Sequence, residues 1–330
     1  MTANVQPALG PRPRPHPDNP PRPLDLGWVQ AARVDTSAVR HQALVASCQI
    51  PRTPPFRAAW LLKAVSFIDL TTLAGDDTPG NVRRLCAKAL HPVKFEVLAA
   101  LGAQTLDLTT AAVCVYHERA ADAVAALGDS GVPVAVVSTG FPAGLVPMRA
   151  RLEEIYASVN DGAREIDIVI ERGLGLRGEW EQLYDQISAY REACGDAHLK
   201  VILGTGELGS FTNVLRASLV AMMAGAHFIK TSTGKETVNA TLAVSLVMMR
   251  AIAEYGRETG AVVGFKPAGG IRTAKDALAW MALLRDTLGR DWLEPGLFRF
   301  GASGLLTDIE NALETIAFDR PAISRRQPLV

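Results

Sequence analysis

The stretch AHFIKTSTGK, residues 226–235, is a short apolar run that ends in Lys230 and passes at once into a Gly-containing polar turn. The stretch VVGFKPAGG, residues 262–270, repeats the pattern around Lys266. Each run reads as a buried strand, and a helical pattern lies between them, which predicts two parallel strands joined by a helix. A lysine at the end of a buried strand is costly unless its charge is used or its pKa falls.

The same alternation continues in both directions along the chain. Eight short apolar runs predict strands at 66–70, 111–116, 132–138, 165–170, 199–203, 227–230, 261–266 and 297–300. Helical patterns lie between most of them, at 149–160, 180–193, 213–224, 239–255 and 274–288. Eight such units predict a (β/α)8 TIM barrel over residues 56–315. A doubly wound open sheet is the alternative.

The ends of the chain differ from this regular part. Eight prolines within residues 1–25 exclude a helix or a central strand there and predict a disordered tail. A polyproline ligand for a partner is the second interpretation of that tail. Residues 26–55 read as a peripheral, partly helical extension, and residues 316–330 as a C-terminal tail.

The composition of the chain limits which partners it could bind. Lysine plus arginine equals aspartate plus glutamate at 34 each, so no global field attracts nucleic acid or an anionic membrane. No apolar run approaches the roughly 20 residues of a membrane span. The four cysteines lack zinc-ligand spacing, and scattered thiols fit a reducing cytoplasm. We therefore expect a cytoplasmic protein.

Polar residues gather where the predicted strands end, which is where barrels carry their chemistry. Asp167 lies within the apolar run Glu165–Ile170, and a carboxylate there needs a partner. If the neighbouring isoleucines pack outward, Asp167 points into the barrel. It serves either as a structural ion pair with a lysine or as a proton relay.

Lys230 and Lys266 on consecutive strands would lie about 4.8 Å apart across the sheet. Surface lysines that extend to solvent are the ordinary interpretation of a single such residue. Two of them, with Asp167 nearby, indicate that one stays protonated and lowers the pKa of the other. The neutral amine can then attack a carbonyl and form a Schiff base.

Three Gly-rich turns follow the last three predicted strands, at 232–235, 268–272 and 301–304. Barrels often bind phosphate through the loops after strands 7 and 8 and a helix N-terminus. Lys235 and Arg272 would add charge to the backbone donors. Ordinary loop glycines are the alternative.

Other motifs carry less weight. Residues 204–209, GTGELG, match a dinucleotide fingerprint, but the next strand ends in Lys230 where that fingerprint needs an acidic residue. No histidine spacing is typical of a metal site, so metal catalysis is not expected. A Schiff-base mechanism on a lysine requires no metal or organic cofactor.

Beyond these residue-by-residue arguments, the chain resembles the deoxyribose-phosphate aldolase family of class I aldolases, which form (β/α)8 barrels. The resemblance runs from about residue 60 to about residue 309. Its motifs are FIDLTTL (67–73), AVCVY (112–116), EIDIV (165–169), TGEL (205–208), FIKTSTGK (228–235), VNAT (238–241), GFKPAGG (264–270) and RFGAS (299–303). The N-terminal extension and the amino-acid sequence of residues 67–77 resemble those of the longer, animal-type branch of the family.

The resemblance implies reversible cleavage of 2-deoxy-D-ribose 5-phosphate to D-glyceraldehyde 3-phosphate and acetaldehyde, in deoxyribonucleotide catabolism. It implies that Lys230 forms the imine, that Lys266 lowers the pKa of Lys230, and that Asp167 relays protons. The implied substrate pocket and phosphate site are larger sets. They comprise Cys114, Asp69, Thr71 and Thr233 for the pocket, and Gly234, Lys235, Gly269, Gly270, Arg272, Gly301 and Ser303 for the phosphate.

Three features depart from the family pattern. His117 stands where a proline is usual, Gly304 where a Ser or Thr usually follows Ser303, and no tyrosine follows Tyr255. The changes at His117 and Gly304 leave open another Schiff-base aldolase with a different donor or acceptor, and the missing tyrosine implies that the tail relay of some family members is absent or replaced. A non-catalytic binding protein that acts through the Pro-rich tail is the alternative of another class. A homo-oligomer is possible.

Overall fold

Eight parallel strands form a barrel at the centre of the molecule. The computed structural model describes residues 17–319. The strands pair in the order β7-β6-β5-β4-β3-β2-β1-β8. Their bounds are β1 Ile68–Thr71, β2 Ala112–Tyr116, β3 Val134–Ser138, β4 Glu165–Val169, β5 His198–Ile202, β6 Phe228–Lys230, β7 Gly264–Lys266 and β8 Phe300–Ala302. Single bridges from Phe265 to Phe298 and from Ala268 to Gly301 join β7 to β8 and close the barrel.

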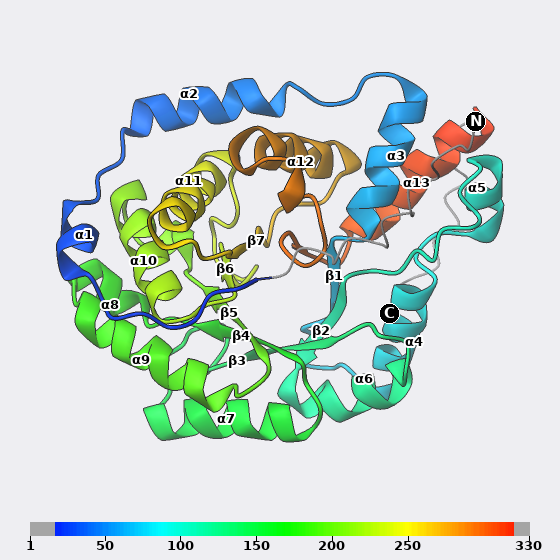
Figure 1. Cartoon of the computed structure of the whole chain (residues 1–330). Coiled ribbons are helices and arrows are strands. Elements are labelled where there is room, and N and C mark those ends of the chain that lie inside the picture. The colour runs from blue at the N-terminus through cyan, green and yellow to red at the C-terminus, as the bar shows by residue number, and fades with distance from the viewer. Residues whose placement is uncertain (1–16, 320–330) are drawn as a thin grey trace, which may run out of the picture.

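Helices surround the strands (Figure 1). Before β5 they are α1 Leu26–Ala31, α2 Thr36–Ser47, α3 Pro54–Val65, α4 Pro79–Leu90, α5 Phe95–Ala100, η1 His117–Arg119, α6 Ala120–Leu127, α7 Met148–Asn160, α8 Arg172–Arg177 and α9 Trp180–Ala193. After β5 they are η2 Thr205–Glu207, α10 Phe211–Met223, α11 Leu242–Thr259, α12 Ala274–Leu288, η3 Arg290–Trp292 and α13 Leu305–Phe318.

Local sequence sets where the helices begin. Ser210, Thr241 and Thr273 each accept a hydrogen bond from the first turn of the helix that follows, and Thr273 forms a capping box with Asp276. Each cap comes soon after a strand that is buried on both faces. This repeated order of buried strand, polar loop and capped helix produces the barrel.

The predicted TIM barrel is confirmed, and the open-sheet alternative is wrong because β7 and β8 meet. All eight predicted strands are present, but the last is displaced. It pairs with β1 over 300–302 and not over 297–300, because Phe298 and Arg299 pair instead with Phe265 of β7.

The N-terminal segment differs from expectation. Residues 1–16 of the predicted disordered tail lie outside the described residues, whereas residues 17–25 pack on the barrel. Asp18 forms an antiparallel bridge with Val262 just before β7. The buried Asn19 amide donates to the carbonyls of Met222 and Ala226, at 2.8 and 2.9 Å. Backbone and side-chain hydrogen bonds thus hold a segment whose prolines exclude helix and central strand.

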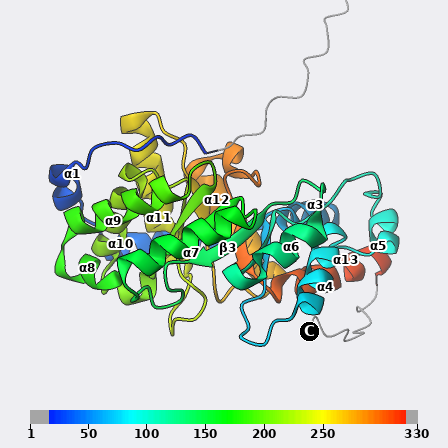
Figure 2. The ribbon, with the colours of Figure 1, turned by 90° about the horizontal axis from the view of Figure 1, so that it is seen from below.

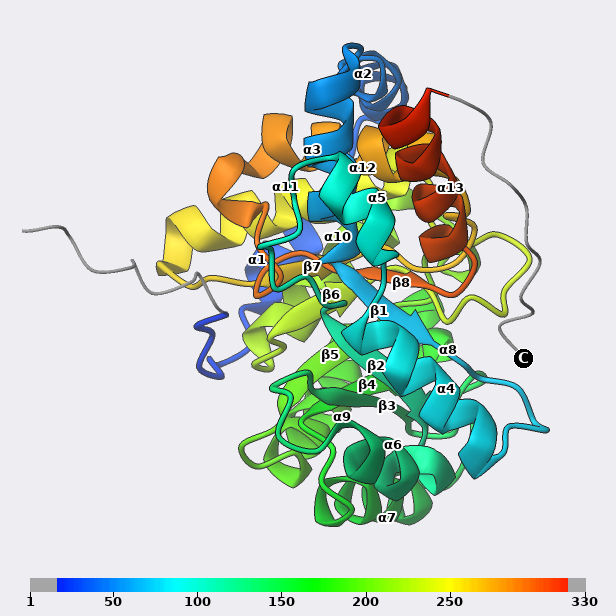
Figure 3. The same ribbon diagram turned by 90° about the vertical axis from the view of Figure 1, so that its right-hand side faces the viewer.

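The elements outside the barrel proper lie at its edges. Helix α2 lies against α11 and α12 on the outside of the ring (Figure 1). Seen from below, α3, α5 and α13 group at one end and α1 with α8 to α10 at the other (Figure 2). Helix α13 packs beside α3 and α5 (Figure 3). It runs past the predicted boundary at residue 315, and residues 320–330 lie outside the described part. None of the helices described is long and apolar enough to span a membrane.

Candidate active site

Lys230 and Lys266 occupy the last positions of β6 and β7 and are direct partners in the strand register. Both side chains are buried, Lys266 completely and Lys230 to all but 4 %. The two ammonium groups meet at one carboxylate oxygen. Lys230 Nζ and Lys266 Nζ each lie 2.7 Å from Oδ2 of Asp167 on β4. The three residues singled out from the sequence therefore form one cluster inside the barrel.

This cluster continues deeper into the barrel than the sequence analysis foresaw. Lys200 of β5 pairs with Asp167 Oδ1 at 3.1 Å, with Asp69 Oδ2 at 3.2 Å and with Glu165. Arg299, just before β8, donates to Asp69 Oδ1 at 2.7 Å and to Glu165 Oε1 at 2.9 Å. We call these seven side chains the interior charge network: Asp69, Glu165, Asp167, Lys200, Lys230, Lys266 and Arg299.

Three members of the network, Glu165, Lys200 and Arg299, were missed. Signals in the sequence could have found Glu165 and Lys200. Glu165 lies two residues before Asp167 on one strand, so both side chains face the same side. Lys200 is a charge within the apolar run 199–203, the criterion that singled out Asp167. Asp69, predicted to line the pocket, is completely buried and is also bonded to Lys266.

The charges of the network do not balance when all seven groups are ionised. Four cations face three carboxylates, which leaves one excess positive charge in a buried site. Among residues 17–319, Lys230 has Asp167 as its sole ion-pair partner, and Lys266 competes for the same oxygen. Loss of one proton from Lys230 removes the imbalance at the smallest cost in Coulomb energy.

The pKa shifts agree with this assignment. Burial, opposed by Asp167 and assisted by Lys266, lowers the pKa of Lys230. The neighbouring cation therefore contributes as expected, but burial is the larger cause. Burial would also lower the pKa of Lys266, yet Asp167 and Asp69 raise it above its ordinary value. Lys266 thus remains protonated while Lys230 can become a neutral amine.

The carboxylate at the centre stays ionised. Burial alone would raise the pKa of Asp167, but Lys200, Lys230 and Lys266 hold it well below its usual range. Its Oδ1 atom accepts no hydrogen bond from the part of the protein that the structure describes. Oδ2 of Asp167 is therefore bonded to Lys230 and Lys266, whereas Oδ1 forms an ion pair with Lys200 at 3.1 Å without hydrogen-bond geometry.

The opposite side of the barrel interior is apolar. Side chains of β2 and β3 form a cluster separate from the main core: Ala112, Cys114, Ala135 and Val137, with Leu73, Tyr116 and Phe141 packed against it. Burial raises the pKa of Cys114, so its thiol is neutral and acts as wall rather than nucleophile. Thr71, at the end of β1, pairs with Cys114 in register and donates to the Asp69 carbonyl at 2.7 Å.

The three glycine turns come together beside Lys230. The Cβ position of Gly234 lies 3.8 Å from the Cα atom of Gly269, and a Cβ on Gly301 would lie 2.7 Å from that of Ala268. Gly234, Gly269 and Gly270 all have positive φ, at 86, 77 and 82 degrees. Only glycine adopts these conformations without strain, so the turns can approach one another closely.

The other residues of the predicted phosphate site lie around these turns. Thr233 is buried, and its hydroxyl donates to Glu236 at 2.7 Å. Lys235 Nζ donates to the carbonyl of Leu73 at 3.2 Å, which links the loops after β6 and β1. Arg272 and Ser303 are exposed. Ser303 immediately precedes the N-cap of α13, a helix start without a side-chain cap.

Two other features do not contribute to this site. The glycines of residues 204–209 serve packing: a Cβ on Gly206 would lie 2.0 Å from the carbonyl oxygen of Val238. Within residues 17–319, no group of three or more His, Cys, Asp or Glu side chains is arranged to hold a metal ion.

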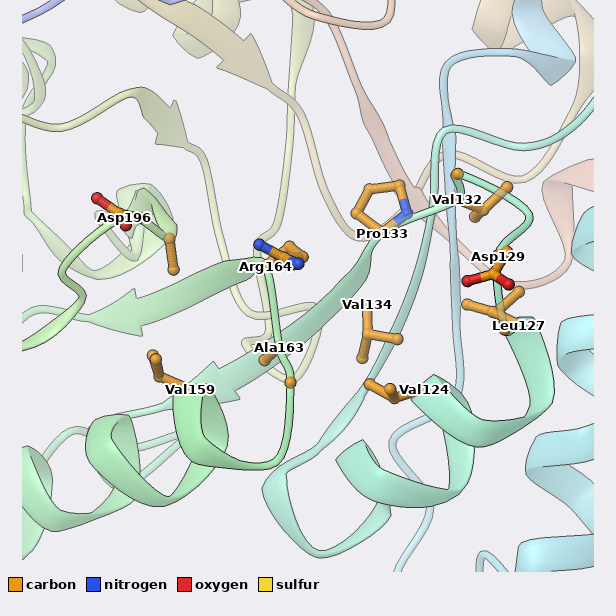
Figure 4. Close-up of a pocket in the computed structure, with 14 residues that line it drawn as sticks. Val124, Leu127, Asp129, Val132, Pro133, Val134, Val159, Ala163, Arg164 and Asp196 are labelled. Atoms are coloured by element: carbon orange, nitrogen blue, oxygen red, sulfur yellow. The ribbon is translucent and has the colours of Figure 1, made fainter.

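The hollow drawn in Figure 4 has a volume of about 690 Å³. It is lined by Pro133 and Val134 at the start of β3 and by Arg164 just before β4. It therefore lies at the amino ends of the strands, whereas Lys230 and Lys266 lie at their carboxyl ends.

Comparison with known proteins identifies the family to which this lysine-containing barrel belongs. A family model described as "DeoC/LacD family aldolase" matches residues 63–301. The chain belongs to this family. This aldolase is 58% identical over 292 residues to "Deoxyribose-phosphate aldolase" of Mus musculus, covering 88% of the chain and 92% of the mouse protein. It is 56% identical, with the same coverage, to "Deoxyribose-phosphate aldolase" of Homo sapiens.

A solved structure shares the fold of this aldolase. It is described as "Unique tetrameric structure of deoxyribose phosphate aldolase from Aeropyrum pernix", with a TM-score of 0.58 and 23% identity over 84% of this chain and 98% of that one. The predicted family and the prediction of an enzyme are confirmed, and the mammalian identities agree with the predicted animal-type branch.

Proposed function

We propose that this aldolase reversibly cleaves 2-deoxy-D-ribose 5-phosphate to D-glyceraldehyde 3-phosphate and acetaldehyde through a Schiff base on Lys230. One observation carries the proposal. Of the three lysines in the interior charge network, Lys230 alone is partly accessible and has a lowered pKa. The identity to the mammalian relatives, both named deoxyribose-phosphate aldolase, supports the choice of substrate.

The covalent steps use the neutral amine. Lys230 Nζ attacks the aldehyde carbon, and the carbinolamine takes up one proton from solvent and loses water to give a protonated imine. The bond between carbons 2 and 3 breaks, and its electron pair passes to the iminium nitrogen, which leaves an enamine on Lys230. Glyceraldehyde 3-phosphate departs. Protonation of the enamine carbon and hydrolysis then release acetaldehyde and the free amine.

The 3-hydroxyl must lose its proton as the carbon–carbon bond breaks. Asp167 and Lys266 are the groups available for this relay, because they lie 2.7 Å apart and next to Lys230. The lowered pKa of Asp167 makes it a poor place for the proton to rest. We therefore assign the pair a shuttling role, in which the proton passes on to the enamine carbon or to solvent.

Phosphate recognition falls to the glycine turns. Backbone N–H groups of the turns after β6, β7 and β8 and the uncapped start of α13 provide donors on one side of the pocket. Lys235 and Arg272 supply positive charge at the rim. A neutral protein can thus hold a phosphosugar through a local site. The apolar wall around Cys114 suits the two-carbon aldehyde fragment.

Borohydride reduction in the presence of substrate tests the proposal. Reduction should add one covalent adduct, located at Lys230 by peptide mass spectrometry, and Lys230→Leu should abolish both the adduct and acetaldehyde release. Lys63→Met, which removes an exposed lysine at the end of α3, is the control and should still be labelled at Lys230. An adduct at another lysine, or full turnover without any adduct, would overturn the assignment.

Assembly and location complete the proposal. The solved relative from Aeropyrum pernix is described as tetrameric, which supports a homo-oligomer here. Light scattering of the purified chain tests this. Four free cysteines, three of them buried, support a reducing, cytoplasmic location, which subcellular fractionation tests.

A further inference from the structure

The loop after β6 already holds an anion of its own. Both carboxylate oxygens of Glu236 accept from the Thr233 backbone N–H at 3.0 Å. Glu236 Oε2 also accepts from the Thr233 hydroxyl at 2.7 Å and from the Gly234 N–H at 3.2 Å. The carboxylate thus occupies backbone donors of the very turn that is expected to bind phosphate.

The loop does not depend on this carboxylate for its conformation. The Asn239 amide donates to the Glu236 backbone carbonyl at 2.8 Å, and the Lys235 N–H donates to the Thr233 hydroxyl at 3.1 Å. The Ser232 hydroxyl donates to the carbonyl of Ala268 at 2.5 Å. The side chain of Glu236 can therefore leave while the donors stay in place.

We propose that Glu236 is a specificity-determining residue whose carboxylate competes with the substrate phosphate for the N–H groups of the loop after β6. The inference rests on the proposed function, because it concerns the phosphate site of that reaction. Glu236 is only partly buried, so its carboxylate can rotate into solvent when a stronger anion arrives.

The competition between the Glu236 carboxylate and the substrate phosphate should favour phosphate. A carboxylate carries one negative charge and a phosphate monoester close to two, so phosphate is the better acceptor for the same donors. Both anions cannot remain there, because like charges at hydrogen-bonding distance repel strongly. Each binding event must therefore release Glu236 from Thr233 and Gly234, and this lowers the net affinity for phosphate. Weaker acceptors at the same position would fail to displace it.

Phosphate binding to full-length variants tests the proposal. Inorganic phosphate is titrated into wild type, Glu236→Gln, Glu236→Ala and the control Glu258→Gln, which removes the same charge from an exposed position on α11. We expect the Kd of phosphate to fall about threefold to tenfold in both Glu236 variants and to stay unchanged in the control. The KM for 2-deoxyribose 5-phosphate should fall in parallel, while kcat/KM for unphosphorylated 2-deoxyribose stays within about twofold.

The outcomes separate this inference from the reaction itself. Weaker or unchanged phosphate binding in both Glu236 variants would overturn the competition, even if deoxyribose phosphate is cleaved normally. No phosphate binding in any variant would overturn it as well. Tighter phosphate binding in a protein that does not cleave deoxyribose phosphate would uphold the competition and refute the proposed substrate.

Discussion

Lys230 and Lys200 are two buried lysines on adjacent strands, and both touch Asp167. Burial disfavours the charged form of each. Yet the pKa of Lys230 is lowered, whereas Asp167, Asp69 and Glu165 outweigh burial and raise the pKa of Lys200. Lys200 has three carboxylate partners and Lys230 shares one with Lys266.

Burial alone therefore does not lower the pKa of a lysine in this barrel. The number of carboxylates within reach decides whether burial or Coulomb attraction dominates. The barrel places the surplus cation of the network at the carboxyl ends of the strands, where substrate can reach it. The compensated cation lies one strand away and deeper. The region around Lys200 is thus compensated by carboxylates, and the region around Lys230 carries the surplus charge that the proposed Schiff-base reaction would use.

Of the substitutions that distinguish Lys230 from Lys200, Lys230→Leu should cause the largest loss of activity. We expect kcat/KM for 2-deoxyribose 5-phosphate to fall by about 10⁴-fold or more, because no other amine of the network is neutral and accessible. Acetaldehyde release measured with a coupled dehydrogenase checks this. Residual activity within about tenfold of wild type would show that Lys230 is not the nucleophile.

Lys200→Met and Lys230→Met should separate the two lysines by stability. Removing Lys200 leaves Asp69 and Glu165 short of a cation, and breaking a buried pair in this way costs about 3–5 kcal/mol. Removing Lys230 takes away the surplus charge and should change the free energy of unfolding by less than about 1 kcal/mol. Urea denaturation of both variants measures the difference. Equal losses would contradict the charge count.

Substitutions of Lys266 should separate charge from proton exchange. Lys266→Arg keeps the positive charge, so the acidic limb of the pH profile should stay in place. Arginine does not exchange its proton readily, so we expect kcat to fall about 100-fold. Lys266→Met removes a cation that lowers the pKa of Lys230. That pKa should then rise. Because the neutral amine is the active form, the acidic limb of kcat/KM should move to higher pH. A limb that moves to lower pH, or turnover near wild type in Lys266→Arg, would contradict the tuning role.

Gly304→Ser should give the smallest effect, because it lies outside the interior charge network and changes binding alone. Gly304 has φ of −77 degrees and open space at its Cβ position, so serine fits without strain. One added hydroxyl donor should lower the KM for the phosphorylated substrate by about fivefold, equivalent to about 1 kcal/mol. The KM for unphosphorylated 2-deoxyribose is the control. If both KM values change alike, Gly304 does not face the phosphate.

Much of the fold followed from local pattern. Apolar runs with helical patterns between most of them predicted each strand, and the predicted helices 180–193 and 274–288 match α9 and α12 in full. The last strand was placed too early. Phe298 and Arg299 read as strand residues, but they bridge to β7 before the ladder with β1 begins. A linear pattern does not contain that change of partner.

Only part of the candidate site was predicted from the sequence. Lys230, Lys266 and Asp167 were found because each is a charge at or within a buried strand. Lys200 and Arg299 obey the same rule but were passed over, although Arg299 is the first residue of the RFGAS motif at 299–303. The hydrogen bonds of Glu236 could not be predicted, because a glutamate in a loop gives no sign of which backbone donors its carboxylate will accept from.

The sequence by itself determined that eight strand–helix units form a parallel barrel and that two lysines and a carboxylate lie at strand ends. Periodicity and burial cost are local properties, so they can be read along the chain. The contacts that lower the pKa of Lys230 and raise that of Lys266 come from the tertiary structure. These pKa shifts depend on how three carboxylates from β1 and β4 are shared among four cations from β5, β6, β7 and the approach to β8. These residues are up to 230 positions apart and meet only when the barrel closes.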